Sequence, residues 1–197
     1  MSTRITIAAI ALWTVLAMGT LIPHGAHADE NPAYSGNSLA YHIPDVSLIN
    51  AEGEPVSLRA ELTIDRPVFV NFIFTSCSSF CPLLTATLAK VQTELLKRGE
   101  TFRIVSISID PEQDTPALLQ AYAQRFHAQK EWHFLTGDAA SMLAVQRAFD
   151  VYRGGKMNHA ALTLMRHPID GRWMRFEGLI NSERLVHEFF KNGGTRP

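Results

Sequence analysis

The chain has 197 residues, 46% of them hydrophobic, and a formal net charge of −1. This apolar content is sufficient for one hydrophobic core, and the sequence contains no internal repeat and no low-complexity tract. Without a run of Lys or Arg, the chain offers no basic surface, so we exclude nucleic acid as a partner.

The first 28 residues have the pattern of a secretory signal peptide. A single charge, Arg4, precedes an apolar run over 5–22, and Ala26 and Ala28 supply the small residues of a cleavage site. We therefore expect cleavage after Ala28 and a periplasmic protein, because nothing resembles an Arg-rich transit peptide. The alternative is an uncleaved anchor in the inner membrane with the domain in the periplasm, since about 18 apolar residues just span a bilayer.

Residues 29–44 are polar and predict a flexible lead-in, whereas 45–197 has the length of one domain. Apolar runs bounded by turn residues indicate buried strands, and apolar residues at helical spacing indicate helices. In chain order, the patterns predict a hairpin within 46–58, strands at 68–74, 102–109, 132–135, 160–165 and 172–177, and helices at 82–98, 116–127, 139–149 and 182–191. Parallel strands joined by helices, followed by a hairpin, predict an α/β fold. The expected architecture is a thioredoxin-like three-layer sandwich with an N-terminal β-hairpin.

Cys77 and Cys81 are the only cysteines, and they follow the first predicted central strand where a helix begins. Two thiols in one turn form either a redox couple or a soft-metal site, and three intervening residues rather than two favour the metal. A structural disulfide is the weaker alternative, because so short a loop stabilises little. The helix N-terminus is expected to lower the pKa of these thiols.

Three features resemble the Sco family (synthesis of cytochrome c oxidase; also called SenC-type proteins) over nearly the whole mature domain. They are the strand followed by Thr75, Cys77 and Cys81-Pro82, the segment 108–116 with its Asp-Pro and Asp-Thr-Pro pairs, and His159 before the last hairpin. Two departures within these motifs are visible. Ser78-Ser79-Phe80 stands where the family commonly has a Pro-Asp-Val-like insert, and Asn158 precedes the histidine in place of Asp.

The resemblance implies a copper ion held by Cys77, Cys81 and His159. Two thiolates and one imidazole suit Cu(I), and a fourth donor would allow Cu(II). The implied function is that of a monomeric, non-enzymatic chaperone. Its client would be a respiratory oxidase subunit such as that of cytochrome c oxidase, or another copper protein, and its donor another copper chaperone. We expect Asp110 in the second shell of the site, and Asp114 or Thr115 as the cap of the next helix.

Two other functions use the same cysteines. In a periplasmic thiol-disulfide reductase, Cys77 would attack a disulfide of the client's copper-binding cysteines and Cys81 would resolve the mixed disulfide. In a redox sensor, the same two cysteines would alternate between the dithiol and the disulfide. Oxidoreductases of this fold place a proline at the entry to the strand after the third helix, where this chain has 157–161 without one. His159 discriminates between the hypotheses, because a reductase tolerates its loss and a copper site does not.

Overall fold

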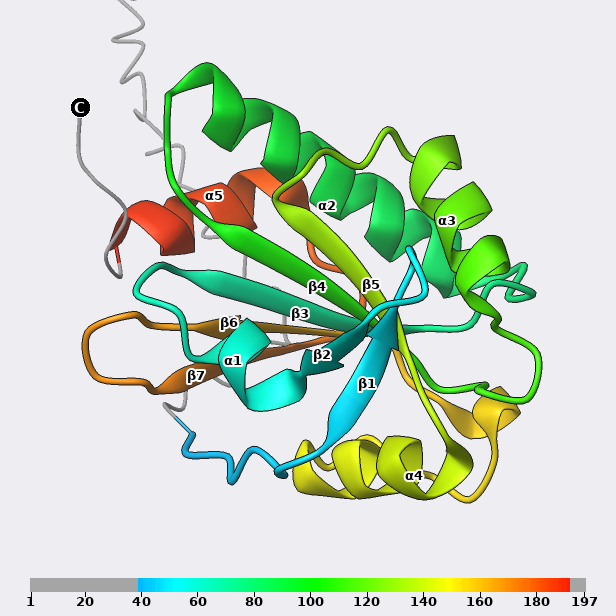
Figure 1. Ribbon diagram of the computed structural model, residues 1–197. Helices are drawn as coiled ribbons and strands as arrows, with labels where there is room; N and C mark the ends of the chain where they lie inside the picture. Colours follow the sequence, from blue (N-terminus) through cyan, green and yellow to red (C-terminus); the bar gives the residue numbers. More distant parts are fainter. Residues whose placement is uncertain (1–38, 192–197) are drawn as a thin grey trace, which may run out of the picture. The chain divides into compact units, whose positions relative to one another are not determined.

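The computed structural model describes residues 39–191 (Figure 1). The expected signal peptide, 1–28, and the first part of the expected lead-in lie outside the described residues. The elements are β1 (Ser47–Asn50), β2 (Pro55–Ser57), α1 (Leu58–Leu62), β3 (Val68–Ile73), α2 (Phe80–Lys97), β4 (Arg103–Ser108), α3 (Pro116–Arg125), β5 (Trp132–Thr136), α4 (Ala139–Ala148), the 3-10 helix η1 (Lys156–Asn158), β6 (Leu162–Arg166), β7 (Trp173–Glu177) and α5 (Ser182–Lys191).

One sheet carries the fold, with strand order β2-β1-β5-β4-β3-β6-β7. Strands β3, β4 and β5 run parallel, as their connecting helices require, and β6 and β7 pair antiparallel beside β3. Strands β1 and β2 form the expected N-terminal hairpin and join the sheet through β5. The carboxyl ends of β3 and β4 therefore lie side by side, and β6 begins at the same edge.

Helices cover both faces of the sheet (Figure 1). Helices α2, α3 and α5 pack on one face in a cluster that includes Leu88, Leu119 and Phe189. The opposite face is covered by α1 and α4, through residues such as Leu58 and Met142. The three-layer α/β architecture expected from the sequence is confirmed.

Strand β3 is buried along its whole length because both faces of the sheet are covered. Alternate side chains supply the two cores: Phe69 and Ile73 contact the α2 side, and Val70 and Phe72 the α4 side. This central strand runs directly into the segment that carries the cysteines.

The structure differs from the sequence predictions in two local details of its helices. A short helix, α1, follows β2, and Ser57 caps it by accepting a hydrogen bond from the Ala60 N–H. Asn181, not Ser182, caps α5, since its side-chain oxygen accepts from the Arg184 N–H at 2.8 Å.

Residues 39–44 belong to the packed domain rather than to a flexible lead-in. Leu39 exchanges two backbone hydrogen bonds with Trp173 at 2.8 and 2.9 Å, and Ile43 is buried. Backbone pairing with β7 and apolar burial hold this segment in place. Among the described residues, no helix is both long and apolar enough to cross a membrane.

Candidate metal centre

The two cysteines lie where β3 passes into α2. Cys77 is in the connecting turn, where its N–H donates to the Phe74 carbonyl at 3.0 Å, whereas Cys81 lies in the first turn of α2. Both are free thiols, and both are buried in the α4-side core, with 9% of Cys77 and none of Cys81 exposed. A partner therefore reaches Cys77 first.

The expectation of a lowered thiol pKa is wrong for Cys81. Burial raises the pKa of Cys81 to about 12, and a hydrogen bond with the Cys77 side chain adds to this effect. Desolvation of a thiolate outweighs the favourable helix N-terminus here. Cys81 is therefore a neutral thiol at physiological pH, and it must lose its proton before it can bind a metal or attack a disulfide.

Asp114 fixes the turn before the cysteines, a role that the sequence analysis missed. Its fully buried carboxylate accepts from the Thr75 N–H at 3.1 Å, from the Thr75 hydroxyl at 2.6 Å and from the Ser108 hydroxyl at 2.6 Å. Thr115, rather than Asp114, caps α3 by accepting from the Leu118 N–H. Asp114 thus joins the ends of β3 and β4 directly before the dithiol.

His159 is buried and lies against the residue that precedes Cys81. Its ring centroid is 5.6 Å from that of Phe80, and its Nε2 is 3.2 Å from the Phe72 carbonyl oxygen. Because a carbonyl oxygen can only accept, Nε2 carries the proton and Nδ1 keeps its lone pair. Burial lowers the pKa of His159, the Phe72 hydrogen bond opposes this shift and Arg153 adds to it. The imidazole is therefore neutral and has one nitrogen free to bind a metal.

A second contact holds the segment before His159 against the sheet. Lys156 in η1 forms an ion pair with Asp110, just beyond the end of β4, and its ammonium lies 5.7 Å from the ring centroid of Phe74. The Asp110 carboxylate is thus engaged with Lys156, at the edge of the sheet where the cysteines lie. Its proposed second-shell role stays a prediction.

The donors match copper in kind but are not yet gathered around one point. In the part of the chain that the structure describes, no cluster of three or more His, Cys, Asp or Glu residues is close enough to hold a metal ion. The structure brings Cys77 and Cys81 together and places His159 beside Phe80. Cys77, Cys81 and His159 therefore do not form such a cluster among the described residues.

Comparison with known proteins shows one family over most of the chain. Residues 36–185 match the profile of the SCO1/SenC family. A SCO1 protein homolog of Bacillus subtilis is 35% identical over 105 residues, which are 52% of this chain and 53% of the relative. The alignment thus spans about half the length of that relative.

Solved structures of the family share the fold. BsSco, described as a Sco cytochrome c oxidase assembly protein with a disulfide switch, superposes with a TM-score of 0.67 at 25% identity, covering 79% of this chain and 95% of BsSco. Arabidopsis thaliana ScoI, solved with copper bound, superposes with a TM-score of 0.64 at 22% identity, covering 80% and 96%. The thioredoxin-like fold expected from the sequence is confirmed.

Proposed function

Because the chain belongs to the SCO1/SenC family, we propose that it is a copper chaperone for the assembly of a respiratory oxidase such as cytochrome c oxidase. Copper is the cargo, and Cys77, Cys81 and His159 are its proposed ligands. The observation that carries the proposal is a pair of adjacent free thiols with a neutral imidazole against the intervening Phe80. Two thiolates and an imidazole form a soft donor set that suits Cu(I).

The tautomer of His159 supports its role as a ligand. Metal-binding histidines usually donate their other ring N–H to a carbonyl or carboxylate, which orients the ring. Here Nε2–H makes such a bond to the Phe72 carbonyl, so Nδ1 is the nitrogen that would bind copper.

Cargo transfer would proceed by exchange of ligands at Cys77. Cys77 is the more accessible thiol, so a thiolate of the client can replace it first while Cys81 and His159 still hold the ion. We place this reaction in the periplasm, with another copper chaperone as donor and an oxidase subunit or another copper protein as client.

A competition titration with a chromogenic Cu(I) chelator tests the proposal. The wild type should bind one copper ion, and His159→Ala should bind it at least tenfold more weakly, about 1.4 kcal/mol. His167→Ala is the matched control, because His167 lies on the distant β6–β7 hairpin and contacts only Asp170 in the described ion pairs. Equal affinity of wild type and His159→Ala would contradict a three-ligand site.

A second candidate function, thiol-disulfide reduction, is favoured by the asymmetry of the thiols. Cys77 is partly accessible, and Cys81 is buried and protonated. In this reaction the Cys77 thiolate attacks a client disulfide, and Cys81 then loses its proton and displaces the client as a dithiol, leaving Cys77–Cys81 oxidised. Reduction of a cystine peptide at the same rate by wild type and His159→Ala, without tight copper binding, would favour this function.

A further inference from the structure

The segment that carries His159 begins at a helix end with a strained backbone. Asp150, which follows the C-cap residue Phe149 of α4, has a φ of 51°, and its N–H donates to the Arg147 carbonyl at 3.1 Å. The Val151 N–H donates to the Gln146 carbonyl at 2.8 Å, which completes a pattern that usually has glycine at the left-handed position. A non-glycine residue keeps this conformation where its surroundings fix the backbone.

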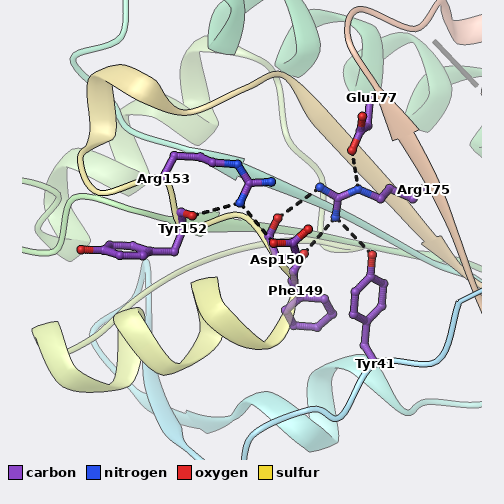
Figure 2. A network of polar contacts seen from close by, with 7 residues as sticks. All are labelled: Tyr41, Phe149, Asp150, Tyr152, Arg153, Arg175 and Glu177. Carbon is purple, nitrogen blue, oxygen red and sulfur yellow. Dashed lines mark hydrogen bonds and ion pairs between the residues drawn. The ribbon is translucent and has the colours of Figure 1, made fainter.

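Arg175 on β7 provides that fixation (Figure 2). Its guanidinium is buried and donates to the Phe149 carbonyl at 2.9 Å and to the Asp150 carbonyl at 3.2 Å. The same group donates to the Tyr41 hydroxyl at 3.1 Å and to Glu177 at 2.8 Å. One planar guanidinium thus donates hydrogen bonds to two carbonyls at the end of α4. The single ammonium of a lysine cannot reproduce this geometry.

Arg175 also lies next to the other end of the segment. It lines a cavity of about 10 Å³ together with His159, Val151 and Arg153. Arg175 and His159 border the same small space, which has about the volume of one water molecule. The start of the segment, its end and β7 therefore meet at Arg175.

We propose that Arg175 is a positioning residue for His159. By fixing the carbonyls of Phe149 and Asp150, it sets the path of residues 150–159 and hence the place of the imidazole beside the dithiol. The significance of this placement for copper rests on the proposed function. The placement itself is a property of the metal-free chain and is tested separately.

The first test measures the ¹⁵N chemical shifts of the His159 ring in the metal-free, full-length protein at pH 8. Wild type should show the Nε2–H tautomer. Arg175→Met should show a mixture of tautomers, because the ring no longer holds its place at Phe72. Arg172→Met is the matched control, since Arg172 lies on the same hairpin with 65% of its side chain exposed.

Arg175→Lys keeps the charge and serves as the variant of choice if Arg175→Met does not fold. It should resemble Arg175→Met in the tautomer measurement, because one ammonium cannot hold both carbonyls. An unchanged tautomer in a folded Arg175 variant would overturn the proposal.

The second test is a double-mutant cycle on Cu(I) affinity. Arg175→Met should weaken binding about tenfold in the wild-type background and have no effect in the His159→Ala background. An equal loss in both backgrounds, or no loss in the first, would overturn the positioning role. If His159→Ala binds copper as tightly as wild type, the proposed function fails instead, and the tautomer measurement still decides the role of Arg175.

Discussion

The dithiol and His159 lie at the same edge of the sheet but are held by different kinds of contact. The cysteines lie between the fully buried β3 and the first turn of α2, and the buried Asp114 carboxylate anchors the turn that joins these two elements. His159 ends a segment of turns that is held by side chains, chiefly Arg175 and the Lys156–Asp110 pair. The thiols are therefore the rigid half of the site and the imidazole the adjustable half.

The largest expected effect concerns the rigid half. In a Cys77→Ala variant, Cys81 is the only thiol, and burial alone should keep its pKa well above the ordinary value of 9.0. With its pKa raised by burial, its thiolate fraction at pH 8 is much smaller than in the unfolded chain. Alkylation by iodoacetamide, followed by mass spectrometry, should be slower by roughly tenfold or more in the folded protein than in urea. Similar rates in both conditions would contradict the buried, neutral thiol.

The same shift gives the pH dependence of stability a definite sign. Because the pKa of Cys81 is raised in the folded state, its contribution to stability is present below about pH 9 and is lost as the pH rises toward 12. The free energy of unfolding of the reduced wild type should therefore fall above pH 9 more steeply than that of Cys81→Ala.

Substitution of Asp114 tests whether its buried carboxylate stabilises the turn before Cys77. Asp114→Ala leaves the Thr75 N–H and the Ser108 hydroxyl without their partner inside the protein, so we expect a loss of about 3 kcal/mol in urea unfolding. Asp170→Ala is the control, since its side chain is 47% exposed and its loss should be within about 0.5 kcal/mol. An unchanged urea midpoint for Asp114→Ala would show that the turn does not depend on this carboxylate.

Substitution of Lys156 is expected to have the smallest effect on stability, and it tests how the segment that carries His159 is held. Lys156→Met should cost less than about 1 kcal/mol, because its side chain is 36% exposed, but should accelerate amide exchange across 150–159. Lys130→Met, at a site 90% exposed, should leave exchange in this segment unchanged. Slower or equal exchange in Lys156→Met would contradict a role of the ion pair in holding the segment.

The sequence was informative where a local pattern decides the structure. The apolar run 68–74 and the helical spacing after Pro82 predicted β3 and α2, and with them the place of the dithiol. Contacts between residues distant in the chain were not visible. Asp114 looked like part of a helix cap, yet its partner Thr75 is 39 residues away.

Arg175 and Lys156, which hold the His159 segment, were missed for the same reason. Arg175 occupies a β7 position that sequence alone would leave to solvent, and its partners come from the N-terminal segment and the end of α4. The pKa of Cys81 was misjudged because the helix N-terminus is a local feature, whereas burial depends on the assembled core. A charged residue that is buried in an edge strand, such as Arg175, indicates contacts with residues that are distant in the sequence.

X-ray absorption spectroscopy of the Cu(I)-loaded protein, compared with His159→Ala, tests the three proposed ligands together. We expect two sulfur donors and one imidazole nitrogen in the wild type, and loss of the imidazole contribution in the variant. Two sulfur donors without an imidazole in the wild type, unchanged in His159→Ala, would contradict this ligand set.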